Sequence, residues 1–179
     1  MKTLTFLLPL IAAGAAWAAD DAQIAKMHDT FLTAADKEIV SLAEAMPADK
    51  FNFAPTEGTF KGVRTFGDQC KHLAAVVYMV SAASLGEKPP VDTGGENGPA
   101  DAKSKDEIVA FMKAAFAYAH KAANAVTADN EHTLVNSPFG DGKIMRGAVL
   151  DMAVWHSFDH YGQMVVYARM NGVVPPASR

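Results

Sequence analysis

Apolar residues recur at three- and four-residue steps in four segments of the chain, a spacing that predicts four amphipathic helices. We expect them at residues 21–46, 66–85, 104–126 and 145–170. In the first helix the inward stripe would be Ile24, Met27, Phe31, Ala35, Ile39, Leu42 and Met46. Helices of such similar length, each with one apolar stripe, pack best as a bundle. The predicted fold is therefore all-α, a four-helix bundle.

Helix-ending residues and two long loops separate these segments. Pro47 follows the first helix and Gly86 the second, while Thr65 and Ser104 occupy N-cap positions. Residues 86–103 contain Pro-Pro and Gly-Gly pairs, which predict a long loop. Residues 130–143 carry turn residues that fit either a small hairpin or an irregular loop.

The first 18 residues have the pattern of an export signal. Lys2 precedes an apolar run at residues 4–13, and Ala16-Trp17-Ala18 forms an A-x-A cleavage site. We therefore expect a secretory signal peptide at residues 1–18, a bundle domain at residues 19–179, and a periplasmic or secreted protein. The apolar run is shorter than the roughly 20 residues of a membrane span, so no stable membrane insertion is expected.

Charge and cysteine content narrow the function classes. The formal net charge is −4 with no basic patch, which argues against nucleic-acid binding. The single cysteine, Cys70, cannot form an internal disulfide. It precedes His72 by two positions and so lies on a different helix face, which favours a buried, small apolar role.

Two histidines on the fourth helix supply the first candidate chemistry. His156 and His160 are four residues apart, so their Cβ atoms lie about 5–6 Å apart on one face. The stripe that carries them should point into the bundle and reads Val149, Ala153, His156, His160, Gln163 and Tyr167. Buried imidazoles need partners, which could be side chains, water or a metal ion.

The second helix adds a third histidine, His72, beside Gln69 on its inner face. Three neutral imidazoles from two helices match the ligand number of a catalytic-type metal site with an open position. The alternative is a set of core histidines that bond one another and buried water. Burial of three unpaired rings is costly, so we favour the metal site at His72, His156 and His160.

The remaining histidines are weaker candidates. His28 could be a fourth ligand, although a solvent-edge position is favoured, and His120 and His132 are predicted to lie at the surface. Asp159 or Asp68 could orient a ligand imidazole by accepting its second N–H group. The sequence has no Glu-x-x-His, His-Glu-x-x-His or Cys-x-x-Cys-His, which argues against a di-iron bundle, a zincin protease and covalent haem.

Several short motifs together resemble the DinB/YfiT-like superfamily of metal-binding four-helix bundles. They are Phe53-x-Pro55, Thr65-Phe66-Gly67-Asp68, His72-Leu73-Ala74 and the segment from His156 to His160 with the Tyr161-Gly162-Gln163 that follows. Members of the family usually have His-x-x-x-His-Arg-Gly-Gln at this last segment, so Tyr161 replaces the common arginine. The resemblance extends over essentially the whole chain after the signal peptide.

The resemblance implies a divalent metal ion, usually zinc or nickel, held at His72, His156 and His160. It also implies that homodimers are common. Characterised members include thiol-dependent transferases and isomerases, in which the metal activates a small thiol as thiolate.

Two functions remain open, and no catalytic residue is assigned. One is a metal-dependent hydrolase or transferase acting on an unknown small-molecule substrate. Its candidate general bases are Asp159, Gln163 and Tyr161, chosen only because they lie close to the histidines in the sequence. The other is a non-enzymatic metal- or ligand-binding module of the cell envelope, whose site would be closed by a fourth ligand such as His28. Non-covalent haem binding between a histidine and a methionine is a weaker third idea.

Overall fold

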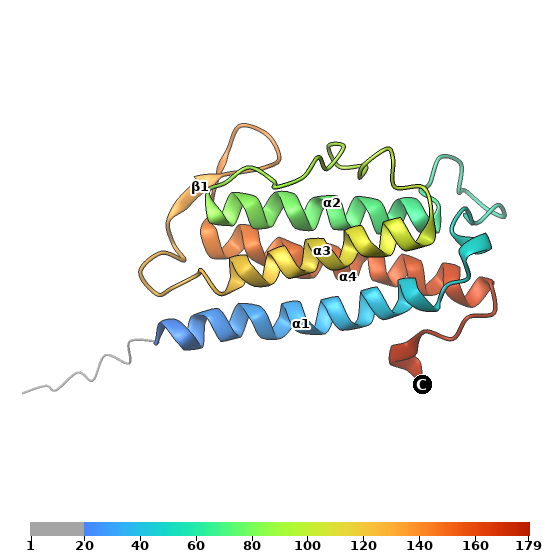
Figure 1. Ribbon diagram of the computed structural model, residues 1–179, viewed down its shortest axis with the longest axis horizontal. Helices are drawn as coiled ribbons and strands as arrows, with labels where there is room; N and C mark the ends of the chain where they lie inside the picture. The colour runs from blue at the N-terminus through green and yellow to red at the C-terminus, as the bar shows by residue number, and fades with distance from the viewer. Residues whose placement is uncertain (1–19) are drawn as a thin grey trace, which may run out of the picture.

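The computed structural model describes residues 20–179, and the predicted signal peptide lies outside this range. Four helices dominate it: α1 (Asp21–Ala45), α2 (Phe66–Leu85), α3 (Lys105–Ala123) and α4 (Arg146–Met170). Short 3-10 turns, η1 (Ala48–Lys50) and η2 (Pro176–Ser178), follow α1 and α4. The helices lie side by side along the long axis of the molecule (Figure 1). The predicted all-α four-helix bundle is confirmed.

Local capping explains where the helices begin and end. The Thr65 hydroxyl accepts a hydrogen bond from the Asp68 N–H at 3.1 Å, which caps α2. Ser104 and Glu107 form a reciprocal capping box at the start of α3. Gly86 ends α2 with a φ of 74°, a left-handed conformation that glycine adopts without steric cost.

A small antiparallel hairpin precedes α4. Its strands are β1 (Leu134–Asn136) and β2 (Lys143–Met145), with Val135 paired to Ile144. Of the two alternatives for residues 130–143, the hairpin is therefore correct. Because β2 leads directly into α4, the hairpin fixes the direction from which the fourth helix enters the bundle.

The core lies between the helices and is centred on α2. This helix packs against α3 and α4, while α1 closes the other side of both. The largest fully buried side chains include Phe66, Leu73, Phe116, Met112 and Met164. Because most of α2 is buried, its polar residues Gln69 and His72 lie inside the protein, and each needs a hydrogen-bond partner there.

The stripe predicted for α1 is wrong in its first half. Met27 and Phe31 are 47% and 61% exposed, whereas His28 and Leu32 are buried. The buried positions 28, 32, 35, 39 and 42 also follow three- and four-residue steps. The apolar pattern placed methionine and phenylalanine inside because a histidine was not expected to be a core residue of this helix.

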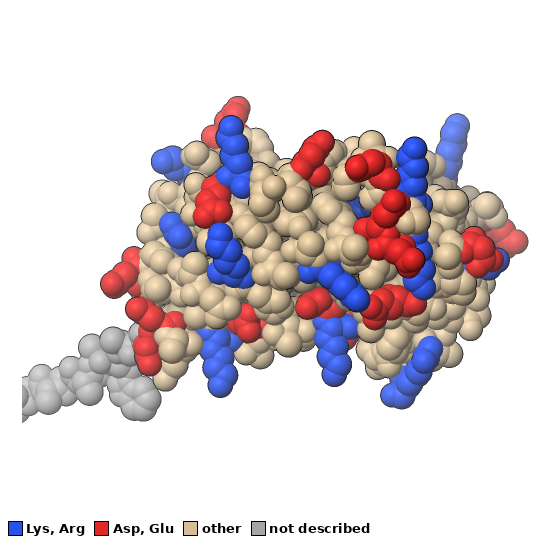
Figure 2. Space-filling view, viewed as in Figure 1, with Lys and Arg blue, Asp and Glu red and all other residues tan. Residues whose placement is uncertain are grey.

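The surface shown in Figure 2 carries acidic and basic side chains in mixture. This agrees with the small formal net charge of −4. Within residues 20–179, none of the helices combines the length and the apolarity that a membrane crossing requires.

Candidate metal site

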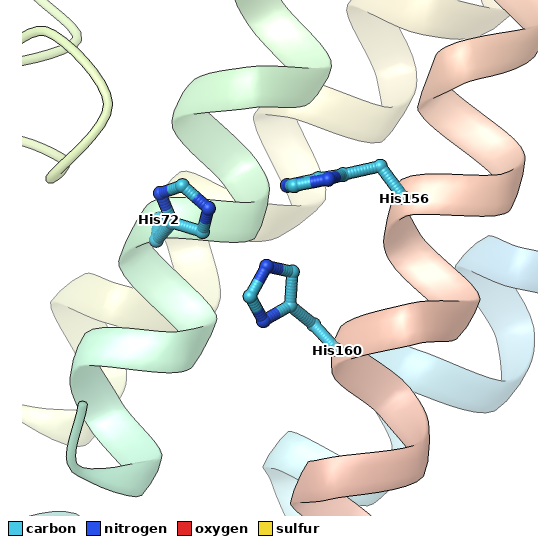
Figure 3. Close-up of side chains that lie close together, drawn as sticks. All are labelled: His72, His156 and His160. Atoms are coloured by element: carbon cyan, nitrogen blue, oxygen red, sulfur yellow. The ribbon is translucent and has the colours of Figure 1, made fainter. Parts of the chain in front are cut away.

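Three histidine side chains from two helices converge inside the bundle. His72 comes from α2, and His156 and His160 come from consecutive turns of α4 (Figure 3). Their ring centroids are 5.1 Å (His72–His156), 4.7 Å (His72–His160) and 4.6 Å (His156–His160) apart. One ring nitrogen from each lies within 4.8 Å of the others, an arrangement that could hold a metal ion.

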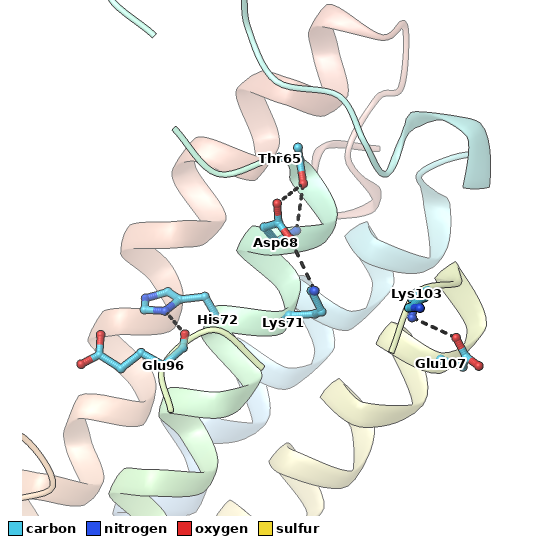
Figure 4. Close-up of polar contacts among 7 residues, drawn as sticks. All are labelled: Thr65, Asp68, Lys71, His72, Glu96, Lys103 and Glu107. Atoms are coloured by element: carbon cyan, nitrogen blue, oxygen red, sulfur yellow. Dashed lines mark hydrogen bonds and ion pairs between the residues drawn. The ribbon is translucent and has the colours of Figure 1, made fainter. Parts of the chain in front are cut away.

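A backbone carbonyl holds the His72 ring. Its Nδ1 donates a hydrogen bond to the carbonyl oxygen of Glu96, in the loop between α2 and α3 (Figure 4). A carbonyl can only accept, so Nδ1 carries the proton and Nε2 keeps its lone pair. An imidazole fixed in this way by its second nitrogen is typical of metal-binding histidines.

Two glutamines hold the His160 ring. Its Nδ1 bonds to Oε1 of Gln69, one turn before His72 on α2. The Gln69 amide donates in turn to Oε1 of Gln163 at 2.9 Å. This chain of bonds assigns the proton of His160 to Nδ1 and again leaves Nε2 free, directed towards the other rings.

The third ring, His156, lacks such a partner. Its Nε2 is buried and makes no hydrogen bond within residues 20–179. In the same part of the chain no hydrogen bond joins any two of the three rings. A buried nitrogen without a partner is costly, and a bound cation would satisfy it.

Electrostatics keep all three imidazoles neutral. Burial lowers the pKa of each ring, and for His156 and His160 the neighbouring histidines lower it further. The pKa of His160 falls to about 4. At neutral pH the rings therefore offer lone pairs, which is the protonation state that a metal ligand needs.

Residues outside the cluster differ from expectation in several respects. His28 is buried, not at the solvent edge, and its Nδ1 pairs with Asp151 at 2.7 Å. It does not join the three-histidine group. His120 is half-buried between Asp29 and Asp36, at 2.6 and 3.6 Å.

Of the outer histidines, only His132 is exposed as expected. Neither acidic residue proposed to orient a ring does so. Asp68 bonds to Thr65 and Lys71 (Figure 4), and Asp159 is exposed. Cys70 is completely buried, and burial raises the pKa of its thiol, in line with an unreactive core role.

Sequence reasoning missed the groups that orient the rings. The Glu96 carbonyl is a backbone atom, which residue type cannot reveal. The glycines that flank Glu96 were a usable sequence signal, because several glycines close together indicate a loop with an unusual backbone conformation. They are Gly94, Gly95 and Gly98. Gln163 was expected inside the bundle; it is exposed but still bonds to Gln69.

Comparison with known proteins agrees with this architecture. Two crystal structures of DinB-like proteins are similar to this chain at 16% sequence identity. The one from Bacillus subtilis has a TM-score of 0.63 and covers 82% of this chain and 92% of its own. The one from Bacillus cereus has a TM-score of 0.61 and covers 83% and 95%.

At this identity the likeness establishes the fold alone. No curated protein matches the chain. The sequence profile of the DinB superfamily matches residues 32–164, from the middle of α1 to beyond His160. That range holds all three clustered histidines and most of the bundle. The chain therefore belongs to the DinB superfamily.

Proposed function

We propose that the protein holds a divalent metal ion, zinc or nickel, at His72, His156 and His160, and uses it as a hydrolase or transferase on a small-molecule substrate. The observation that carries the proposal is the convergence of three neutral imidazoles, one of which has a buried Nε2 without a partner. Three histidines are the ligand set of several catalytic metal sites. Imidazole suits zinc, nickel, copper and iron, so the preference for zinc or nickel rests on the family resemblance.

The residues of this chain have separable roles in that site. The Glu96 carbonyl and Gln69 hold two rings with Nε2 directed to the centre, which reduces the reorganisation needed on metal binding. Within residues 20–179 no fourth His, Cys, Asp or Glu joins the group, which supports a site with open positions. A metal ion bound there would act as a Lewis acid towards water, a thiol or a substrate oxygen.

Metal analysis tests the proposal directly. Purified protein should contain close to one divalent ion per chain, and His156→Ala should lose it. His132→Ala is the matched control, because that histidine is exposed in the hairpin region away from the cluster. Equal metal content in the two variants would contradict the site.

A substrate screen then separates an enzyme from a binding module. Ester, amide and thiol-transfer substrates would be offered to metal-loaded wild type, His132→Ala and His156→Ala. Activity that His156→Ala loses and His132→Ala keeps supports the enzyme. If the metal-loaded wild type and His156→Ala are equally inactive on all three classes, the non-enzymatic metal-binding module becomes the better description.

We also propose that the protein is exported to the periplasm or secreted. The support is sequence alone: Lys2, the apolar run at residues 4–13, and the Ala16-Trp17-Ala18 site. The N-terminus of protein recovered from the cell envelope should be Ala19. An intact N-terminus in a cytoplasmic fraction would contradict export.

A further inference from the structure

A pocket of about 570 Å³ lies where α2 ends. Three elements line it: the last two turns of α2, the first residues of the loop that follows, and the hairpin of β1 and β2. Figure 1 shows the hairpin and the start of this loop beside the same end of α2. Pockets that bind small molecules usually measure roughly 300–1,000 Å³, so this one is large enough for a ligand.

Part of the pocket wall is apolar. Met79 and Ala83 of α2 lie one turn apart in this wall and are only half-buried, whereas most of the helix is buried. From the hairpin, Leu134 lines the pocket and is 59% exposed, and Val135 and Pro138 line it as well. Apolar side chains that meet water at a concave surface offer a place for the apolar part of a ligand.

Two lysines line the same pocket from different elements. Lys88 belongs to the loop after α2, and Lys143 begins β2. Both are exposed, and neither forms an ion pair within residues 20–179. An ammonium group is a compact positive charge with three N–H donors, so each lysine can bind a carboxylate or phosphate oxygen.

The acidic residue of the lining, Glu87, does not cancel these charges. One glutamate against two lysines leaves the charged residues of the lining with a formal sum of +1. The Glu87 carboxylate is also already engaged by α3: it accepts a hydrogen bond from the Tyr118 hydroxyl at 3.1 Å and lies 3.5 Å from the Lys121 ammonium. The charge that remains for a ligand is therefore positive, and an anion complements it.

A hydroxyl on a nearly buried residue adds a hydrogen-bonding group to the wall. Thr93, in the loop after α2, lines the pocket and is only 8% exposed. Its hydroxyl makes no hydrogen bond to any other residue of the described range, 20–179. Polar groups withdrawn from water need a partner, and the pocket is the open space that Thr93 borders. An acceptor atom of a ligand would satisfy this donor.

We propose that this pocket binds a small amphipathic anion, a molecule with an apolar chain and one carboxylate or phosphate group. The chain packs on the apolar wall, and Lys88, Lys143 and the Thr93 hydroxyl bind the acidic group. The lining contains none of the three clustered histidines, so this site is separate from the proposed metal site and does not depend on a metal ion.

Titration calorimetry with four probes tests this proposal. Octanoate and octyl phosphate share one chain and differ in the acidic group. Octanol has the same chain without a charge, and acetate has the charge without the chain. Purified wild type should bind at least one of the two amphipathic anions about tenfold or more tightly than octanol or acetate, because the chain and the charge both contribute.

Variants then locate the binding site. Lys88→Gln/Lys143→Gln removes both charges of the pocket. Lys26→Gln/Lys37→Gln is the matched control, since it removes two exposed lysines of α1 that form no ion pair within residues 20–179 and do not line the pocket. Circular dichroism and thermal unfolding verify that both double variants fold like wild type.

Lys88→Gln/Lys143→Gln should weaken binding of the anion about tenfold or more and leave octanol unchanged, whereas the α1 control should bind like wild type. Thr93→Val keeps the shape of the side chain and should cost about two- to tenfold, the effect of one hydrogen bond. Leu134→Thr should weaken octanoate and octanol alike. Equal anion affinity in the two double-lysine variants overturns the proposal, and so does the failure of both amphipathic anions to bind wild type.

His156→Ala distinguishes the pocket from the metal site, because a carboxylate can also bind a metal ion. This variant should lose the metal but bind octanoate like wild type. Octanoate binding that disappears in His156→Ala and survives in Lys88→Gln/Lys143→Gln places the anion on the metal and overturns the pocket. Lysine-dependent binding in a wild type without metal supports the pocket and removes the metal site, so the two proposals fail separately.

Discussion

Each of the three clustered histidines is held in a different way. The His72 ring bonds to a backbone carbonyl, the His160 ring to a glutamine side chain, and His156 Nε2 to no group within residues 20–179. A backbone partner moves only with its loop, whereas a side-chain partner can be removed by one substitution. Gln69 is therefore the residue at which orientation of the site can be tested with least disturbance.

Gln69→Leu should weaken metal binding about 10- to 100-fold, the usual effect of losing a partner of a ligand histidine. The substitution removes the acceptor of His160 Nδ1 but fills nearly the same space in the buried interior. Gln163→Leu should have a smaller effect, because it removes only the acceptor of the Gln69 amide and leaves the bond between Gln69 and His160 in place. Affinity is measured by competition with a chromogenic chelator. Unchanged metal affinity in Gln69→Leu would show that Gln69 does not act through His160.

His28 and Asp151 predict a pH-dependent contribution to stability. The hydrogen bond that His28 Nδ1 donates to the Asp151 carboxylate raises the pKa of His28, with Glu131 adding to the effect and burial opposing it. A raised pKa in the folded state stabilises the fold below the unfolded pKa of about 6.5 and loses this effect as the pH rises through the folded value. Asp151→Asn should therefore destabilise the protein more at pH 5.5 than at pH 8.5.

Urea unfolding at the two pH values measures this difference. At pH 5.5 we expect a loss of about 1.5–3 kcal/mol, the range for a hydrogen bond to a charged group. Asp141→Asn is the control, because that carboxylate is exposed in the hairpin. Because the substitution removes only the partner of His28, the change of this difference with pH reports on His28. A difference independent of pH would contradict the assignment.

At the scale of elements, the loop between α2 and α3 belongs to the site. It runs back along α2 (Figure 1) and places the Glu96 carbonyl on His72. Gly98 allows this approach: its φ is 79°, and a Cβ atom there would lie 2.6 Å from Lys71 Cβ. The loop and the helix therefore fit together only with glycine at this position.

Gly98→Ala should displace the loop, lower stability by about 1–3 kcal/mol and weaken metal binding. Gly95→Ala separates the two causes: its φ is 62°, also positive, but no atom lies within 4 Å of an added Cβ. Both variants carry backbone strain, but only in Gly98→Ala does the added Cβ atom collide with α2. Thermal unfolding and chelator competition measure the two effects. Equal metal affinity in the two variants would show that the loop does not control His72.

These elements show what the sequence could and could not predict. Apolar spacing located the four helices, and helical spacing brought His156 and His160 together, because both depend on local geometry. The inward face of α1 was misplaced since Met27 and Phe31 are apolar yet exposed. The partner of His72 depends on the path of the loop between α2 and α3. The partner of His160 is a glutamine 91 residues away in the sequence. Local sequence patterns contain information on neither.

At the scale of the whole molecule, α1 and α4 share an exposed apolar face. Met27, Phe31 and Trp155 are 47%, 61% and 56% exposed, and Phe158 lies one turn beyond Trp155. Between α1 and α4 this face contains a pocket of about 290 Å³, which Phe31 and Trp155 line. Protruding aromatic side chains beside a pocket are self-complementary, since each copy can offer a side chain to the pocket of the other. We propose that this face binds a second copy of the chain in a symmetric homodimer.

Trp155→Glu should convert the dimer into a monomer. In a symmetric dimer the two introduced carboxylates would be buried near the two-fold axis without a cation to pair with. The molar mass is measured by light scattering after size-exclusion chromatography. Leu134→Glu is the matched control, since Leu134 is 59% exposed but lies in the hairpin. A wild-type monomer would contradict the homodimer, and a dimer that survives Trp155→Glu would exclude this face.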